Sequence, residues 1–120
     1  MKVQYRFMRT RGGVTKFARI TLVSSPAEEW DLWFGPAAEE LGASHEAAVR
    51  SGIAAATRRQ DSLGGPRHRI EIEALEQTLA DASIDAIECA AAIAAWMSFG
   101  HDEADVSVVH AADRWQVAFE

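Results

Sequence analysis

Residues 48–96 read AVRSGIAAATRRQDSLGGPRHRIEIEALEQTLADASIDAIECAAAIAAW and carry the strongest pattern in the chain. Spacings of three and four residues, which mark one face of a helix, join Val49, Gly52, Ile53 and Ala56. Residues 63–66, LGGP, end this helix, because glycine and proline interrupt helical backbone. A strand and a second helix follow, so the segment predicts a helix–turn–strand–helix unit.

The first helix has a marked start and an unusual glycine. Ser44 is expected to be its N-cap, and Glu46 suits the positive end of the helix dipole. Gly52 lowers helix propensity by about 1 kcal/mol relative to alanine. A close approach of another backbone would explain a glycine here.

The strand and the second helix differ in how much of their surface is apolar. One strand face carries Ile70, Ile72 and Ala74, and the other carries Arg69, Glu71 and Glu73. One polar face is typical of a sheet that is covered on one side. Asp81 and Ser83 can both cap the second helix, whose apolar stripe comprises Ile84, Ile87, Ala91 and Ala94. Residues 89–97 contain no charged side chain, so we expect this helix to be buried on more than one side.

The remaining segments alternate with the period of two that is expected for strands. The first strand would bury Val3, Tyr5 and Phe7, and after a Gly12-Gly13 turn the strand over residues 16–24 would bury Ala18, Ile20 and Leu22. A short strand is expected over residues 29–34, and a final hairpin would turn at residues 111–113. The predicted fold is an α+β two-layer sandwich, with two helices on one face of a mainly antiparallel, mixed sheet.

The length, net charge and cysteine count of the chain limit the kinds of protein that it can be. A chain of 120 residues is expected to form a single domain, 1–120. The net charge of −6 disfavours non-specific binding to nucleic acid, although a local basic patch can still bind. Cys89 is the one cysteine, so no intramolecular disulfide can form. With no signal-peptide pattern and no apolar run of ~20 residues, a cytoplasmic protein without a membrane partner is expected.

The middle segment resembles domain IV of translation elongation factor G and of its eukaryotic counterpart. The residues that carry the resemblance are Val49, Gly52 and Ile53 of a Val-x-x-Gly-Ile pattern, the Gly65-Pro66 turn, the helix start Asp81, Ser83, Ala86 and Ala90, and the upstream Tyr5-Arg6. Ile87 replaces an aromatic residue of the family. The resemblance implies a four-stranded sheet with two helices on one face and a left-handed βαβ crossover, against the usual rule.

The chain also departs from this family. The family's longer, glycine- and arginine-rich tip loop is reduced here to Arg9, Arg11, Gly12 and Gly13. No GxxxxGK[ST] phosphate-binding loop occurs, so the chain lacks the motif of a GTPase. We therefore expect a relative of one domain rather than a whole translocase.

Two surfaces are candidates for binding. The first would contact RNA or the ribosome and comprises Arg6, Arg9, Arg11, Gly12, Gly13, Lys16 and Arg19. Arginine suits phosphate, but the same residues could simply guard an edge strand against aggregation. A second basic set, at one end of the first helix, comprises Arg58, Arg59, Arg67, His68 and Arg69, and its position relative to the first is left open.

The second surface is the open sheet face, with Trp33, Glu71 and Glu73 as candidate residues of a protein interface. An exposed tryptophan is a common interface anchor, although it could equally cover a sheet edge. An acidic chain of this kind would suit a basic protein partner, and the same face would allow copies of the chain to associate.

Catalysis is not expected. Ser24, Ser25, His45 and His110 supply the residue types of a nucleophile and a base, but no motif brings them together. Glu71 and Glu73 lie about 7 Å apart along a strand, which would allow acid–base work but is also usual for a polar sheet face. The polar loop with His101, Asp102, Glu103 and Asp105 matches no zinc spacing, so neither a metal nor a cofactor is expected.

Overall fold

The structure, a computed structural model, describes residues 1–39, 41–77 and 83–119. Within these residues the elements follow in the order β1 (Lys2–Arg11), β2 (Val14–Ala27), β3 (Asp31–Phe34), the 3-10 turn η1 (Pro36–Ala38), α1 (Ala43–Ser62), β4 (Arg67–Gln77), α2 (Ile84–Ser98), η2 (Glu103–Asp105), β5 (Val106–Ala111) and β6 (Arg114–Phe119). Each predicted strand and helix is present, with ends that differ from the prediction by a few residues.

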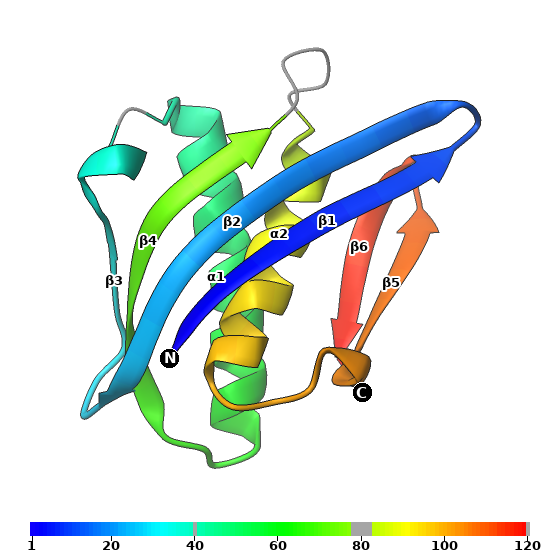
Figure 1. Cartoon of the computed structure of the whole chain (residues 1–120). Helices are drawn as coiled ribbons and strands as arrows, with labels where there is room; N and C mark the ends of the chain where they lie inside the picture. Colours follow the sequence, from blue (N-terminus) through cyan, green and yellow to red (C-terminus); the bar gives the residue numbers. More distant parts are fainter. Residues whose placement is uncertain (40, 78–82, 120) are drawn as a thin grey trace.

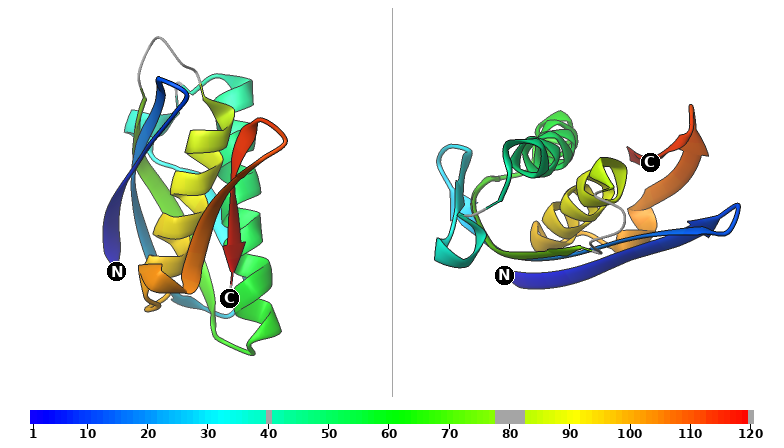
Figure 2. Two further views of the ribbon diagram at one scale, coloured as in Figure 1. Left: turned by 90° about the vertical axis from the view of Figure 1, so that its right-hand side faces the viewer. Right: turned by 90° about the horizontal axis from the view of Figure 1, so that it is seen from above.

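Four strands form one mixed sheet in the order β1-β2-β4-β3. The pairs β1–β2 and β2–β4 are antiparallel, whereas β3 runs parallel to β4. The helices α1 and α2 lie side by side on one face of this sheet (Figure 1, Figure 2). The predicted α+β sandwich is therefore confirmed.

The connection from β3 through α1 to β4 is a left-handed crossover. In Figure 1, β3 and β4 both point upward, α1 returns behind the sheet, and β4 lies to the right of β3. A path that rises in front, descends behind and advances to the right turns in the left-handed sense, which is the rare one. The structure therefore has the left-handed βαβ crossover that the resemblance implies.

The apolar faces of the first two strands are those that the alternation predicts. Val3, Tyr5 and Phe7 are buried in β1, and their neighbours in β2 with buried side chains are Ala18, Ile20 and Leu22. The core therefore lies between this sheet face and the helices.

A bulge in β4 changes which side chains face the helices. Leu22 pairs with Ile72 and Thr21 pairs with Ala74, so Glu73 is an extra residue in β4. Beyond the bulge, Leu75 packs against the core. The prediction that Ala74 shares the face of Ile72 is wrong, because the inserted residue reverses the alternation.

The central element is α2. It contacts β1 and β2 on one side, α1 on another and β6 on a third. Ile87, Cys89, Ile93 and Trp96 are all buried. The prediction of burial on several sides is therefore confirmed, and it accounts for the lack of charge over residues 89–97. Ile84 does not belong to the buried stripe, because it lies in the first turn of α2 and is 37% exposed.

The helix α1 joins the core mainly by packing against α2. A Cβ atom at Gly52 would lie 2.2 Å from the carbonyl oxygen of Glu88 and 3.0 Å from the Cβ of Ala91. The two helix backbones therefore touch at Gly52. The close approach expected from the sequence is confirmed.

Two of the predicted helix N-caps lie within the described residues, and one of these two predictions is confirmed. Ser83 caps α2, because its hydroxyl accepts the backbone N–H of Ala86. The prediction of Ser44 as the cap of α1 is wrong. The N-cap is Gly42, whose carbonyl accepts the N–H groups of His45 and Glu46, so Ser44 already lies inside the first turn. Asp81 lies outside the described residues.

The strands β5 and β6 form a separate antiparallel hairpin beside α2, on the helix side of the sheet (Figure 2). Its turn places Ala112 and Asp113 at φ angles of 53° and 62°, which non-glycine residues seldom adopt. The Phe119 ring centroid lies 5.2 Å from that of Trp96. The hairpin was predicted, but its position beside α2 was not.

We predict that Gly52→Ala lowers the free energy of unfolding by about 2 kcal/mol, because a forced backbone shift costs more than the gain in helix propensity. Urea denaturation followed by circular dichroism measures this change. The exposed neighbour provides a control: Ser51→Ala should change stability by less than about 0.5 kcal/mol. Equal or higher stability of Gly52→Ala would contradict the close helix contact.

Candidate functional site

The first candidate surface is the end of the β1–β2 hairpin, which extends beyond both helices as an arm (Figure 1). Gly12 and Gly13 form its turn at φ angles of 60° and 79°, a two-residue turn that suits glycine. The side chains over residues 10–15 are exposed, and a Cβ at either glycine would meet no atom within 4 Å. The backbone at the tip is therefore open to a partner.

The strand register divides the predicted basic residues between the two sides of the arm. Arg6 pairs with Arg19 on the outer sheet face, away from the helices. Arg9 pairs with Lys16 on the side of the helices, in line with the buried pair of Phe7 and Ala18. The residues predicted as one RNA-contacting set therefore lie on two faces.

Internal contacts neutralise part of this set. Lys16 forms an ion pair with Asp85 at 2.8 Å, and Arg19 forms one with Glu76. The Arg9 guanidinium lies 5.1 Å from the centroid of the Phe7 ring. Among the described residues, Arg6, Arg9 and Arg11 have no ion-pair partner. These three arginines are the cations that the arm can offer to a ligand.

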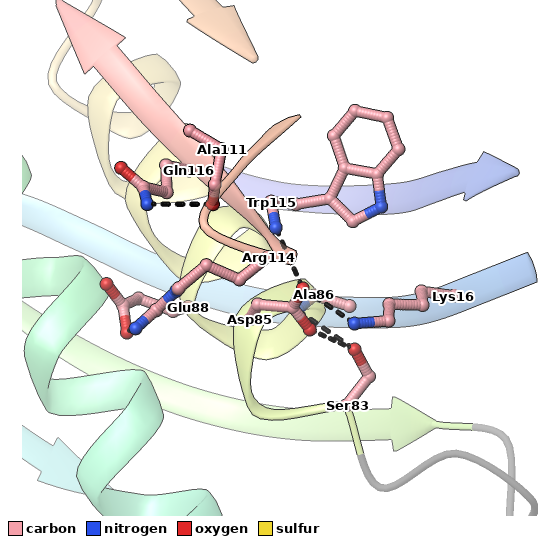
Figure 3. Close-up of polar contacts among 9 residues, drawn as sticks. All are labelled: Lys16, Ser83, Asp85, Ala86, Glu88, Ala111, Arg114, Trp115 and Gln116. Atoms are coloured by element: carbon pink, nitrogen blue, oxygen red, sulfur yellow. Dashed lines mark hydrogen bonds and ion pairs between the residues drawn. The ribbon is translucent and has the colours of Figure 1, made fainter. Parts of the chain in front are cut away.

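Asp85, in the first turn of α2, ties the base of the arm to the final hairpin (Figure 3). Its carboxylate accepts hydrogen bonds from Lys16 Nζ at 2.8 Å, from the Ser83 hydroxyl and from the backbone N–H of Trp115 at 2.9 Å. Burial alone would raise the pKa of Asp85, but the hydrogen bonds from Lys16, Ser83 and Trp115 outweigh burial and lower that pKa to about 2. Asp85 is therefore charged at neutral pH.

A cavity of about 290 Å³ lies between the arm and the final hairpin. We call it the arm cleft, and its lining residues are Arg11, Val14, Lys16, His110, Asp113 and Trp115. The Trp115 ring is half-buried and meets the Phe7 ring edge to face, with centroids 6.3 Å apart. The ring centroids of His110 and Trp115 are 4.9 Å apart, and the two ring planes meet at an angle of 79°. Sequence reasoning missed this juxtaposition, because no pattern tells where the hairpin packs.

The second basic set lies at the other end of the molecule. Its residues belong to the end of α1 and the start of β4, far from the tip of the arm (Figure 1). Arg67 lies 4.0 Å from Asp61, and His68 is buried. The two basic sets therefore do not form one surface.

The second candidate surface is the outer sheet face, where Trp33, Glu71 and Glu73 do lie together. They border a hollow of about 490 Å³ that also involves Val23, Ser25 and Arg69. Trp33 is 36% exposed, and its indole N–H donates to Glu71 Oε1 at 3.1 Å. Glu73 pairs with Lys2 at 3.0 Å. These side chains already have partners within the chain.

A further hollow of about 270 Å³ separates α1 from β3. Apolar side chains such as Leu32, Ile53 and Ile70 form much of its lining. Arg50 lies at its margin and is paired with Glu46 at 2.9 Å. The other charged residue in its lining is Asp31, and this combination of side chains points to no particular ligand.

Among the residues considered for catalysis, Ser24 has a histidine neighbour that the sequence did not suggest. Ser24 lies beside His68, with 3.5 Å between Oγ and Nδ1, rather than beside His45 or His110. Both side chains are buried, and the Ser24 hydroxyl donates to the carbonyl oxygen of Ser98 at 3.0 Å. Burial, followed by the N-terminal ammonium and His101, lowers the pKa of His68. This pair therefore belongs to the core.

The polar loop after α2 is likewise used internally. His101 stacks on Trp96 with ring centroids 3.8 Å apart, and the Trp96 indole N–H donates to Asp105. Glu103 accepts a hydrogen bond from Tyr5, whose pKa is raised to about 12 by burial and by Glu103. In the described part of the chain, no group of three or more His, Cys, Asp or Glu residues could hold a metal ion.

None of the helices described here has the length and apolar character needed to cross a membrane.

Comparisons with known proteins identify a shared fold. No protein-family model matches the chain, and no curated protein matches it either. The crystal structure of ttk003000868, a protein from Thermus thermophilus, superposes with a TM-score of 0.66 and 17% sequence identity. The match covers 80% of this chain but only 15% of the Thermus chain. At this identity the likeness concerns the fold alone.

We predict that Asp85 contributes roughly 2 kcal/mol to stability at neutral pH, because the pKa of its carboxyl group is lower in the folded chain than in the unfolded one. This contribution is complete above the unfolded pKa and is lost as the pH falls toward 2. Asp85→Asn should therefore lower the free energy of unfolding at pH 7, and its difference from the wild type should shrink between pH 5 and pH 2.

Urea denaturation across this pH range measures the effect. Glu46→Gln, which breaks the exposed pair with Arg50, is the control and should cost less than about 0.5 kcal/mol at any pH. A difference between Asp85→Asn and the wild type that does not change with pH would show that the charge of Asp85 is not what stabilises the fold.

Proposed function

We propose that the chain is a non-catalytic binding module that contacts RNA, ribosomal RNA in particular, through the tip of the β1–β2 arm. The observation that carries the proposal is the projecting arm itself, where Arg9 and Arg11 have no ion-pair partner among the described residues. Guanidinium groups bind phosphate oxygens with two parallel hydrogen bonds, which suits a nucleic-acid backbone.

The turn supports the same function. Gly12 and Gly13 leave the backbone N–H groups of the tip without a covering side chain. The main chain of the turn is therefore open to a phosphate. Two arginines beside two glycines form a small contact surface at the end of a projecting hairpin.

The resemblance to domain IV of elongation factor G points the same way. In that family the corresponding tip loop reaches the ribosomal decoding region, and here the same end of the fold carries arginine and glycine. The βαβ crossover of the rare hand supports a relationship at the level of fold. The shorter tip is the main difference, and it makes a smaller contact with RNA the expectation.

We predict that Arg9→Glu combined with Arg11→Glu abolishes co-sedimentation of the chain with ribosomes at low salt. In the wild type, the two phosphate contacts should contribute about 1.4 to the slope of log K against log salt, since each contact to single-stranded RNA contributes about 0.7. Arg58→Glu with Arg67→Glu, the same change of charge at the other end of the molecule, is the control and should still co-sediment. Unchanged binding of the Arg9/Arg11 variant would overturn the proposal.

A second candidate function is the binding of a protein partner, or of a second copy of the chain, through the outer sheet face. No described element covers this face (Figure 2), and it exposes Met8 and Trp33. The net charge of −6 favours a basic partner. The internal contacts of Trp33 and Glu71 make this candidate the weaker one.

If the outer face is an interface, Trp33→Ala should weaken the association about thirtyfold or more, because truncation of a central interface tryptophan costs about 2 kcal/mol or more. Size-exclusion chromatography and affinity capture from lysate measure the association. Leu63→Ala, at an exposed apolar residue outside this face, is the control. A folded wild-type monomer that captures no protein would exclude this candidate.

A further inference from the structure

The arm cleft has the composition of a nucleotide site. Two of its six lining residues, Arg11 and Lys16, are cationic, and His110 and Trp115 supply aromatic rings. Proteins that bind single-stranded nucleic acid combine cations along the backbone path with aromatic rings for the bases. The cleft presents both within one hollow.

The cations of the cleft differ in what they can offer. Lys16 is held by Asp85 at 2.8 Å, so its charge is largely compensated. Arg11 has no ion-pair partner among the described residues and projects from the exposed end of β1. Arg11 is therefore the group in the cleft that is best placed to bind a phosphate.

The aromatic wall is held in a fixed position. The backbone N–H of Trp115 donates to the buried Asp85, while the ring points away from that carboxylate (Figure 3). Edge-to-face contacts with Phe7 and His110 orient the ring further. A base that stacks against Trp115 would meet a ring that has little conformational freedom left to lose.

Asp113 limits how many phosphates the cleft can hold. Its carboxylate lines the same hollow and would repel a phosphate placed beside it. The volume of about 290 Å³ is also at the lower end of the range for small-ligand sites. Size and charge together suit one nucleotide, with its phosphate at Arg11 and its base at Trp115, rather than a run of phosphates.

We propose that the arm cleft binds one unstacked nucleotide of single-stranded RNA, with the base against Trp115 and the phosphate on Arg11. The inference rests on the proposed RNA-binding function and adds to it the part of the RNA that is recognised. Base-paired RNA stacks its bases inside the helix, so the cleft selects loops and single strands.

The test titrates the whole chain with a short fluorescein-labelled oligouridine and follows binding by fluorescence anisotropy. In parallel, NMR follows the indole N–H signals, each assigned with a Trp→Phe variant. We expect the Trp115 signal to shift on binding while that of Trp33, on the outer sheet face, stays in place. Asp113→Asn should tighten binding several-fold, because it removes the repelling charge and asparagine also tolerates the backbone of this turn.

Trp115→Leu should weaken binding about tenfold by the loss of stacking. Since this variant also removes the contact with Phe7, the NMR shift and the Asp113→Asn gain provide readouts in chains that keep the packing. A duplex of the same length and a polyglutamate peptide serve as competitors, and both should compete poorly.

The outcomes separate the two proposals. Oligouridine binding could depend on Arg9 and Arg11 while the Trp115 signal does not shift and Asp113→Asn does not change the affinity. This result would overturn the nucleotide site in the arm cleft and leave the RNA-binding role of the arm standing. No oligouridine binding at all would overturn the cleft, whereas the arm is tested separately by the dependence of ribosome co-sedimentation on Arg9 and Arg11. Competition by polyglutamate as strong as that by RNA would show recognition of bare negative charge, and would overturn the nucleotide site.

Discussion

The contact of α1 with α2 at Gly52 is the constraint on which the rest of the fold depends. Because the backbone of α2 fills the space of a side chain at this position, the two helices lie closer than ordinary side chains allow. The helix α1 then covers a side of α2 that would otherwise face solvent. With the sheet on one side and β6 on another, α2 has little surface left for a charged residue. The alanines of this helix follow from that crowding.

Asp85 is the charged residue that connects this crowded helix to its neighbours. It lies in the first turn of α2, where its charge suits the helix dipole, and it reaches out of the apolar core toward Lys16 and Trp115. One carboxylate thereby fixes the base of the arm and the final hairpin relative to the central helix. It also uses one of the cations that the arm would otherwise offer. Lys16 is therefore used for structure, whereas Arg11 has no ion-pair partner among the described residues.

The sequence predicts what local periodicity can encode. The alternation of Val3, Tyr5 and Phe7 locates their buried face, and Gly52 signals a close contact because glycine is otherwise unfavourable within a helix. The bulge at Glu73 cannot be predicted in this way, since an inserted residue leaves no mark in the pattern until the partner strand is known. The arm cleft is hidden for a related reason. Trp115 is recognisable as a strand residue, but only tertiary packing brings it beside Arg11.

The negative net charge of the chain is compatible with the RNA-binding function that we propose for the arm, because most of that charge lies far from the tip. The molecule extends over 43 × 33 × 20 Å, whereas charges in solution at physiological salt are screened beyond about 8 Å. The tip therefore senses the few charges around it rather than the total of −6. With so few free cations, phosphate contacts can supply only part of the affinity. Shape and stacking would have to supply the rest, and the proposed nucleotide site joins Arg11 to Trp115 for that purpose.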